Sequence, residues 1–297
     1  MKVLVTGATG LVGSALVPFL TEGGHEVFRL SRSDPRNAND ITWNPDSSDL
    51  PNARLEGLDA VVHLAGENIA AHRWNPQVKE RLRRSRIGAT KFLCESLAQL
   101  HRPPQSLICA SAIGYYGDRG SEILTESAAP GTGFLAELCR DWEAACEPAR
   151  RQGMRVVNLR IGVVLSPKGG GLAKMLTPFR MGVGGVVGSG RQYWSWIAID
   201  DLVGAIHHCL NHSHVSGPVN ATAPCPVTNR EFTRTLGSVL GRPTFVPMPA
   251  FAARLAMGEM ADDLLLGSAR VMPNRLSESN FKFQYPVLEG ALRHLLQ

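Results

Sequence analysis

The chain opens on Lys2-Val3-Leu4-Val5-Thr6-Gly7-Ala8-Thr9-Gly10-Leu11-Val12-Gly13, and this stretch decides the fold. An apolar strand enters a glycine-rich turn, and the apolar spacing after it predicts a helix. Gly7 permits the tight bend, Gly10 lets the backbone approach a pyrophosphate, and Gly13 allows the helix to pack closely on the strand. The free N–H groups and the positive end of the helix favour phosphate. The pattern predicts a dinucleotide-binding turn, and an ordinary strand–turn–helix corner is the less favoured alternative.

The second predicted strand ends at Ser31-Arg32-Ser33, where sites that prefer NAD usually carry a carboxylate for the ribose hydroxyls. No acid stands at this point. A guanidinium with hydroxyls suits the 2′-phosphate of NADP(H), because it can donate charge-assisted hydrogen bonds. We therefore expect NADP(H) as the cofactor, with Ser31 and Arg32 as contacts. The alternative is that Arg32 is a solvated loop charge and that Asp34 takes the role of the acid.

Composition indicates a compact globular protein. Of the 297 residues, 44% are hydrophobic and only 19% are charged. The net charge is +5, but the basic residues are dispersed, and the densest group, 79–86, lies on a predicted helix. An anionic cofactor accounts for this charge as well as a nucleic acid would, so we expect no nucleic-acid partner.

The six cysteines contain no Cys-x-x-Cys pair and fall mostly within apolar patterns, which predicts buried thiols in a reducing compartment. No apolar run reaches the roughly 18 residues that a membrane span requires. No signal-like segment precedes the first strand. We expect a cytoplasmic protein without a membrane partner.

Strand-like runs alternate with helical patterns along the first half of the chain. Strands are expected at 3–5, 27–30, 59–65, 106–110 and 155–160, with a weaker candidate at 41–43, and helices near 13–23, 76–100, 134–152 and 199–211. This alternation predicts an α/β fold with a doubly wound (Rossmann) parallel sheet.

The residue composition and the hydrophobic pattern change after residue 165, which suggests a second structural unit. Glycine-rich loops follow, and the chain from Thr228 onward is rich in helical patterns and prolines. We expect residues 1–165 to form the dinucleotide-binding domain, with 196–222 returning to it. Residues 166–195 and 223–297 would form a smaller C-terminal substrate lobe over the carboxyl edge of the sheet.

Several motifs together resemble the extended short-chain dehydrogenases/reductases over nearly the whole chain: 6–13, 62–66, 116–118, 160–165 and 196–202. Within that superfamily, three further segments are similar to an atypical branch called "epimerase family protein", which is nucleoside-diphosphate-sugar epimerase-like. These segments are Gly66-Glu67-Asn68-Ile69 with Arg73-Trp74, Ser195-Trp196-Ile197, and Pro273-Asn274-Arg275-Leu276.

The resemblance implies a set of cofactor contacts on the first three strand ends and beyond. Together with Ser31 and Arg32 they are Thr6, Gly7, Thr9, Gly10, Leu11, Val12, Gly13, Leu64, Ala65, Gly66, Arg86 and Val163. Arg86 stands where relatives usually carry a structural asparagine, so it serves either phosphate binding or backbone support.

The catalytic pair of that superfamily is missing. Its chemistry uses a Tyr whose phenol exchanges a proton with the substrate oxygen and a Lys four residues on, which lowers the phenol pKa. Phe134 and Leu138 occupy these positions, and neither can transfer a proton. Ser111, Tyr116 and Glu67 are the substitutes that we name, although loop packing is the favoured interpretation of Tyr116.

Arg73 and Arg191 are candidate anchors for an anionic substrate, and Trp196 is a candidate for stacking on a substrate ring. The alternative for Trp196 is packing between the lobes. The histidines near 207–214 lack a plausible set of further ligands, so we expect no metal site.

The leading hypothesis is an NADP(H)-binding oxidoreductase or epimerase-like enzyme acting on a small or nucleotide-linked carbonyl. The competing hypothesis is a non-catalytic NADP(H)-binding sensor or scaffold, because the binding residues are present and the proton-transfer pair is not. The substrate is an unknown small molecule. A homodimer through the helices near 76–100 and 134–152 is possible, since many relatives of this type form one.

Overall fold

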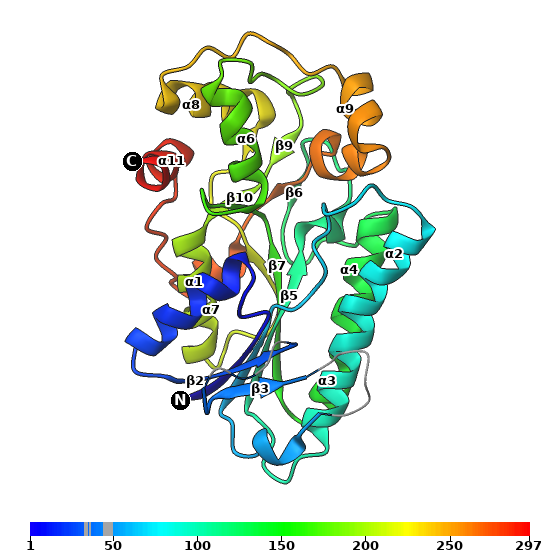
Figure 1. Ribbon diagram of the computed structural model, residues 1–297, viewed down its shortest axis with the longest axis vertical. Coiled ribbons are helices and arrows are strands. Elements are labelled where there is room, and N and C mark those ends of the chain that lie inside the picture. Colours follow the sequence, from blue (N-terminus) through cyan, green and yellow to red (C-terminus); the bar gives the residue numbers. More distant parts are fainter. Residues whose placement is uncertain (33–34, 36, 44–49) are drawn as a thin grey trace.

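Seven parallel strands form the central sheet of the computed structural model, which describes residues 1–32, 35, 37–43 and 50–297 (Figure 1). Their order is β11-β7-β5-β4-β1-β2-β3. The strands are β1 (Lys2–Thr6), β2 (Glu26–Ser31), β3 (Asp40–Thr42), β4 (Ala60–His63), β5 (Ser106–Ala112), β7 (Arg155–Ile161) and β11 (Gly217–Ala221). The order reverses between β1 and β4, so the loops that follow these two strands lead away from each other. They leave a crevice at the carboxyl edge of the sheet.

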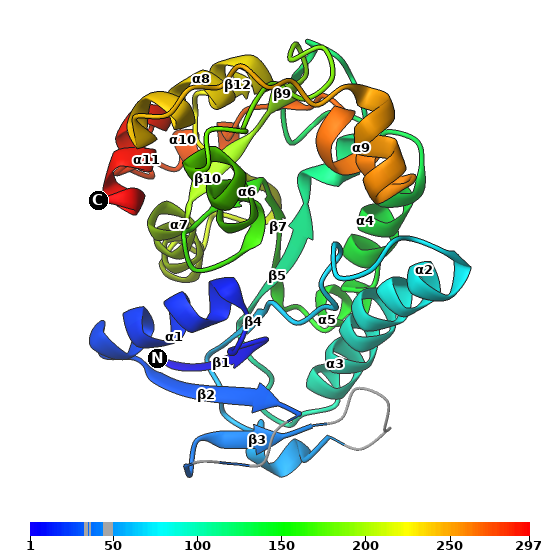
Figure 2. The same ribbon diagram turned by 45° about the horizontal axis from the view of Figure 1, so that its top comes forward.

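Helices cover both faces of this sheet (Figure 2). On one face lie α1 (Leu11–Glu22) and α7 (Ile199–Asn211), which share a buried apolar cluster with alternate residues of the strands. On the other face a second cluster is covered by the π-helical turn η2 (Arg84–Gly88), α3 (Ala89–Ala98), α4 (Phe134–Ala144) and α5 (Glu147–Arg151). Helix α2 (Pro76–Arg83) precedes η2 and packs with α4 in a separate cluster. Strands buried on both faces require apolar residues in succession, as in Val3-Leu4-Val5, whose side chains are fully buried.

A smaller lobe with its own apolar core lies beyond the carboxyl ends of the strands (Figure 1). Its helices are α6 (Gly170–Arg180), α8 (Asn229–Leu240), α9 (Ala250–Met257) and α11 (Leu288–Leu296), whereas α10 (Asn274–Glu278) packs against β11 and its Leu276 belongs to the cluster beneath α1 and α7. Its short strands form three pairs: β8 (Val163–Leu165) with β10 (Trp196–Ala198), β9 (Tyr193–Trp194) with β12 (Val227–Thr228), and β6 (Ile123–Leu124) with β13 (Arg270–Val271). The remaining turns are η1 (Asn52–Arg54), η3 (Ile113–Tyr116) and η4 (Asp262–Leu266).

The structure confirms the doubly wound parallel sheet and all six expected strands, including the weaker candidate at 41–43. Two expected helices are interrupted: 76–100 contains the π-helical turn, and 134–152 breaks between α4 and α5. β11 was not predicted as a strand. It lies in the segment 196–222, which also contributes α7 to one face of the main sheet.

Five of the six cysteines are buried, as expected, and Cys225 is exposed, which corrects the prediction for that residue. Cys225 lies in the loop before β12 rather than in an apolar element. Within the described part of the chain, no helix is both long and apolar enough to cross a membrane.

Candidate cofactor cleft and active site

The turn between β1 and α1 requires glycine at two positions for different reasons. Gly7 has a φ of +67°, and a Cβ there would lie 2.8 Å from the carbonyl carbon of Leu64. A Cβ on Gly13 would lie 2.2 Å from the carbonyl oxygen of Gly7 and 2.7 Å from the Cα of Ala8. The first glycine therefore brings the turn against the end of β4, and the second brings α1 against the turn.

Gly10 is the N-cap that precedes α1, and it leaves the approach to the helix open. Its N–H donates to the carbonyl oxygen of Gly7 at 3.0 Å. The heavy atom nearest to a Cβ on Gly10 would be that same oxygen, at 3.3 Å. Since Gly10 adds no side chain over the first turn, a phosphate can approach the positive end of the helix.

A cleft of about 700 Å³ opens in front of this turn. Nine of the predicted cofactor residues line it: Thr6, Gly7, Thr9, Gly10, Ser31, Arg32, Leu64, Ala65 and Gly66. They come from the ends of β1, β2 and β4 and from the loops that follow these strands. The volume falls within the range of small-molecule and cofactor sites.

The other predicted cofactor residues do not line this cleft. Leu11 packs beside Gly169, because a Cβ added to Gly169 would lie 3.2 Å from the Cδ1 of Leu11. Val12 packs against the apolar cluster beneath α1, and Gly13 lies within that helix. The N–H of Val163 donates to the carbonyl oxygen of Ser195 at 2.8 Å. These residues hold the elements around the cleft in place.

Arg86 supports the backbone of the loop after β4. Its Nη2 donates to the carbonyl oxygen of Glu67 at 2.8 Å, and its guanidinium lies 5.2 Å from the ring centre of Trp142. Burial lowers the pKa of this guanidinium. Of the two roles considered for Arg86, the structure therefore shows backbone support.

The far wall of the cleft contains residues that sequence analysis did not assign to the site. Trp43 and Phe92 stack with ring centres 6.0 Å apart and planes inclined by 13°. Both line the cleft, as do Arg81, Arg84, Ser85, Gly88 and Ala89 of the helices opposite. Phe92 is partly exposed, whereas Trp43 is only 4% exposed and belongs to the buried apolar cluster of that face. Arg32, which follows β2 in the near wall, is exposed, and Asp34 lies outside the described residues.

A buried histidine connects the first turn to the helical layer. The Nδ1 of His63 lies 2.7 Å from Thr6 Oγ1, and its Nε2 lies 3.0 Å from Thr90 Oγ1. Thr6 Oγ1 also accepts from the N–H of Ala65 at 3.2 Å, and Thr90 Oγ1 accepts from Trp142 Nε1 at 2.8 Å. Burial lowers the pKa of His63 to about 4, so the imidazole is neutral at physiological pH.

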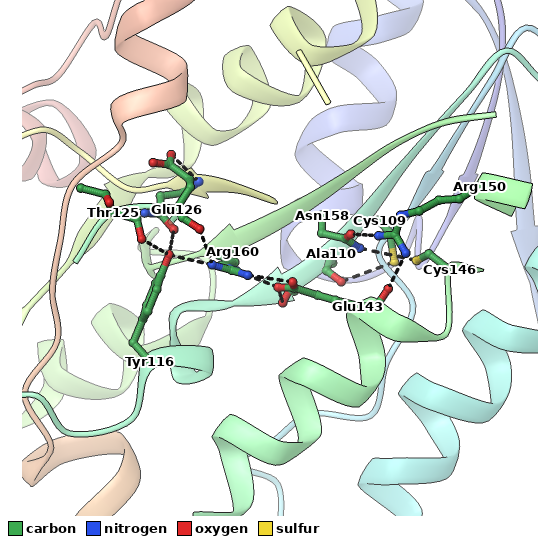
Figure 3. A network of polar contacts seen from close by, with 12 residues as sticks. Cys109, Ala110, Tyr116, Thr125, Glu126, Glu143, Cys146, Arg150, Asn158 and Arg160 are labelled. Carbon is green, nitrogen blue, oxygen red and sulfur yellow. Dashed lines mark hydrogen bonds and ion pairs between the residues drawn. The ribbon is translucent and has the colours of Figure 1, made fainter. Parts of the chain in front are cut away.

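Two of the three predicted catalytic residues, Ser111 and Tyr116, are engaged in a buried polar network. Figure 3 shows Tyr116 in this network with Glu143 and Arg160. Ser111 donates to Glu143 Oε1 at 2.8 Å, and Glu143 pairs with Arg160 through Nε at 2.8 Å. The phenol of Tyr116 donates to Asn220 Oδ1 at 2.7 Å and accepts from Arg160 Nη1 at 3.0 Å. Burial raises the pKa of this phenol. A substrate oxygen could reach Ser111 or Tyr116 only by displacing one of these partners.

Phe134 and Leu138 belong to an apolar cluster between α4 and α2. The ring of Trp74 meets the ring of Phe134 edge-on with centres 5.0 Å apart, and Lys79 Nζ lies 5.0 Å above the Phe134 ring. Leu138 is 1% exposed among apolar neighbours that include Val78. Apolar packing therefore surrounds both side chains.

Glu67 is the predicted catalytic residue that lies in the cleft wall. Its side chain is 29% exposed, and its Oε1 accepts from Arg81 Nε at 3.2 Å. Its N–H donates to Ser85 Oγ at 3.2 Å, so the residue is held on both its backbone and its side chain.

The substrate candidates lie apart from one another. Arg73 is exposed and packs at the end of α9. A Cβ added to Gly258 would lie 3.1 Å from the Nη2 of Arg73. Arg191 is exposed on the loop before β9. The prediction for Trp196 is wrong: its ring is fully buried in the core of the smaller lobe, and its Nε1 donates to the carbonyl oxygen of Cys225 at 3.1 Å. A ring without exposed surface cannot stack on a substrate.

Comparisons with known proteins agree with this geometry. Residues 3–221 match the NAD dependent epimerase/dehydratase family, and residues 248–295 match a domain of unknown function, DUF1731. Epimerase family protein Mb2239 of Mycobacterium bovis is 44% identical over 290 residues, which are 98% of this chain and 96% of that protein.

Two solved structures are similar over the whole chain. The crystal structure of human epimerase family protein SDR39U1 with NADPH superposes with a TM-score of 0.90 at 35% identity, covering 99% of each chain. That of the nucleoside-diphosphate sugar epimerase from Corynebacterium glutamicum superposes with a TM-score of 0.83 at 40% identity, covering 100% of this chain and 58% of that one. The chain therefore belongs to the NAD dependent epimerase/dehydratase family, within the extended short-chain dehydrogenases/reductases, and groups there with the epimerase family proteins.

Proposed function

We propose that the protein binds NADP(H) in the cleft and acts as an oxidoreductase or epimerase-like enzyme on a small or nucleotide-linked carbonyl compound. The observation that carries this proposal is the cleft itself, whose wall contains nine residues expected to contact the cofactor. The NADPH named with the human relative supports the choice of NADP(H) for this chain. A bound nicotinamide supplies or accepts the hydride.

The residues of the cleft fit this dinucleotide. The open side of Gly10 admits the phosphates at the start of α1, and the Trp43 and Phe92 rings border the opposite end. Arg32 offers a guanidinium at the end of β2, where the 2′-phosphate would lie. Two or three charge-assisted hydrogen bonds from such a group favour the phosphorylated nucleotide.

Glu67 is the residue that we assign to proton exchange. Ser111 and Tyr116 already have buried partners, and Phe134 and Leu138 have no exchangeable proton. Glu67 borders the cleft, and its carboxylate is held there by Arg81.

The test follows NADPH oxidation across a panel of carbonyl compounds, including nucleotide-linked sugars. Glu67→Gln should abolish turnover while NADPH binding is retained, and Glu137→Gln, on an exposed carboxylate of α4, is the matched control. If the wild-type protein oxidises NADPH with no member of the panel, the enzymatic proposal fails and the binding proposal stands on calorimetry alone.

A second candidate is a sensor that changes its affinity for a partner protein with NADP(H) occupancy. The apolar packing of Phe134 and Leu138 favours it, because this cluster has no group that can exchange a proton. Capture of a partner that depends on NADPH would support the sensor, and capture that is equal with and without NADPH would contradict it.

A further inference from the structure

Seven large apolar side chains are exposed together at one end of the smaller lobe. This set, called here the apolar pole, contains most of the eleven exposed large apolar residues in the described part of the chain. Its members are Met181, Val183, Phe245, Val246, Met248, Phe251 and Leu255. Their exposure ranges from 45% for Met248 to 87% for Phe245. A concentration of this kind marks an interaction surface.

Backbone contacts hold the two segments of the apolar pole together. The loop after α6 and the connection from α8 to α9 meet in β-bridges between Gly185 and Phe245 and between Val187 and Met248. The N–H of Met248 donates to the carbonyl oxygen of Val186 at 2.8 Å. The exposed side chains are therefore presented on a connected framework rather than on independent loops.

Helix α9 turns an apolar face outward. Phe251 and Leu255, one helical turn apart, are 71% and 76% exposed, whereas Ala253 on the opposite side is fully buried. Such a helix buries its small residue and presents its large ones to the surroundings, the reverse of the usual arrangement at a protein surface.

The apolar pole lies far from the nucleotide-binding end of the sheet. Figure 1 shows the connection from α8 to α9 along the upper edge of the molecule, with β2 and β3 toward the opposite end of the long axis. A contact at this end leaves the cofactor cleft, which is lined by the ends of β1, β2 and β4, open.

The loops and the helix that carry the apolar pole contain basic residues and no acidic ones, and acidic residues follow α9, where Asp262 pairs with Arg254 and Glu259 pairs with Lys79. The sequence contains no Asp or Glu between Glu147 and Asp200, and none between Glu231 and Glu259. Exposed Arg180 precedes Met181 directly, and exposed Arg242 precedes Phe245 by three residues. Within the part of the chain that the structure describes, neither arginine forms an ion pair, so their charges are available to an external anion.

We propose that the apolar pole docks on the surface of an anionic membrane, with Phe245, Phe251 and Leu255 inserted among the headgroups and Arg180 and Arg242 contacting lipid phosphates. Protruding, highly exposed side chains suit insertion into a soft interface, since a protein partner would have to provide a separate pocket for each of them. Phe and Leu beside Arg are the side chains that bind at such an interface. The sequence expectation of no membrane partner rested on the lack of a spanning segment, which interfacial docking does not need.

The experiment measures co-sedimentation of the full chain with vesicles of phosphatidylcholine alone and of phosphatidylcholine mixed with phosphatidylglycerol. The wild-type protein should sediment with the mixed vesicles and much less with the neutral ones. The triple variant Phe245→Ser, Phe251→Ser, Leu255→Ser should lose partitioning by about tenfold or more, because the inserted apolar area is gone. The double variant Arg180→Glu, Arg242→Glu should lose the preference for phosphatidylglycerol.

The matched control is Ile123→Ser with Val287→Ser, two exposed apolar residues outside the apolar pole, each 57% exposed. It should bind vesicles like the wild type. Circular dichroism that is unchanged in all variants shows that the fold is intact. Wild-type protein that stays in the supernatant with both vesicle types would overturn the proposal. So would sedimentation velocity showing a wild-type dimer that the triple variant converts to monomer, since the apolar pole would then serve self-association.

Discussion

The glycines of the first turn allow binding and stability to be separated. In Gly13→Ala the new methyl group would lie 2.2 Å from the Gly7 carbonyl oxygen and 2.7 Å from the Ala8 Cα. Both are backbone atoms of the turn, so no side chain can rotate away and α1 must shift. Overpacking of this kind costs about 2–3 kcal/mol in the free energy of unfolding. Because the shift also moves the turn, NADPH affinity should fall as well.

Gly10→Ala should behave differently. Its methyl group would approach only the Gly7 carbonyl oxygen, at 3.3 Å, and the φ of −75° suits alanine. The free energy of unfolding should therefore change by less than about 1 kcal/mol, while the methyl group obstructs the approach of the pyrophosphate. NADPH affinity should fall by about tenfold or more, which corresponds to about 1.4 kcal/mol.

Urea unfolding and NADPH calorimetry on both variants test this separation. Gly290→Ala is the control, because a Cβ at this helical position has no heavy atom within 4 Å. It should stabilise α11 by about 0.5–1 kcal/mol through helix propensity and leave NADPH binding unchanged. If Gly13→Ala is as stable as the wild type, or if Gly10→Ala binds NADPH normally, the account of the turn is refuted.

Three further predictions concern buried groups. Arg160→Met should lower the free energy of unfolding by about 3–5 kcal/mol, because it leaves the Glu143 carboxylate without its buried partner; an unchanged urea midpoint would contradict this. The pKa of His63 falls from 6.5 to about 4 on folding, so the unfolded chain binds more protons between these values and stability declines as the pH drops through this window. The full loss in the free energy of unfolding is about 3 kcal/mol. His63→Gln should therefore flatten the pH profile of urea unfolding relative to the wild type. Parallel profiles of the two proteins would show that His63 does not cause the pH dependence. Leu138→Lys should lower the free energy of unfolding by more than about 2 kcal/mol, because it buries an ammonium in the apolar cluster at a site 1% exposed. Thermal unfolding at the wild-type temperature would contradict this and show that the cluster opens.

The central strands could be predicted because burial on both faces leaves a direct mark on the sequence. Val3-Leu4-Val5 is apolar at every position, and the same holds for most of 106–110. β11 escaped prediction because it is an edge strand that begins with Gly217-Pro218, two residues that weaken a strand pattern. Tertiary pairing with β7 makes this segment a strand.

The near wall of the cleft follows from the sequence because its residues lie directly after β1, β2 and β4. The far wall does not, since Trp43 and Phe92 come from separate elements that meet only in the folded chain. Neither residue lies in a motif that points to nucleotide binding.

Trp196 shows the limit for single aromatic residues. Strand alternation places Trp194 and Trp196 on the same side, and the packing of the smaller lobe makes that side the interior. The sequence alone cannot distinguish this side from one that faces a cleft. The partners of Ser111 and Tyr116 could not be predicted from the sequence either, because Glu143 and Arg160 belong to α4 and β7, which meet these residues only in the folded chain.

The central claim is that the cleft holds a phosphorylated nicotinamide nucleotide through Arg32. Titration calorimetry of NADPH and NADH against the wild type and Arg32→Ala tests it most directly. Charge-assisted hydrogen bonds of about 1.5–3 kcal/mol predict that the wild type binds NADPH about 10- to 150-fold more tightly than NADH, and that Arg32→Ala removes this preference without weakening NADH. Equal affinity of the wild type for the two nucleotides, or no binding of NADPH, would contradict the account.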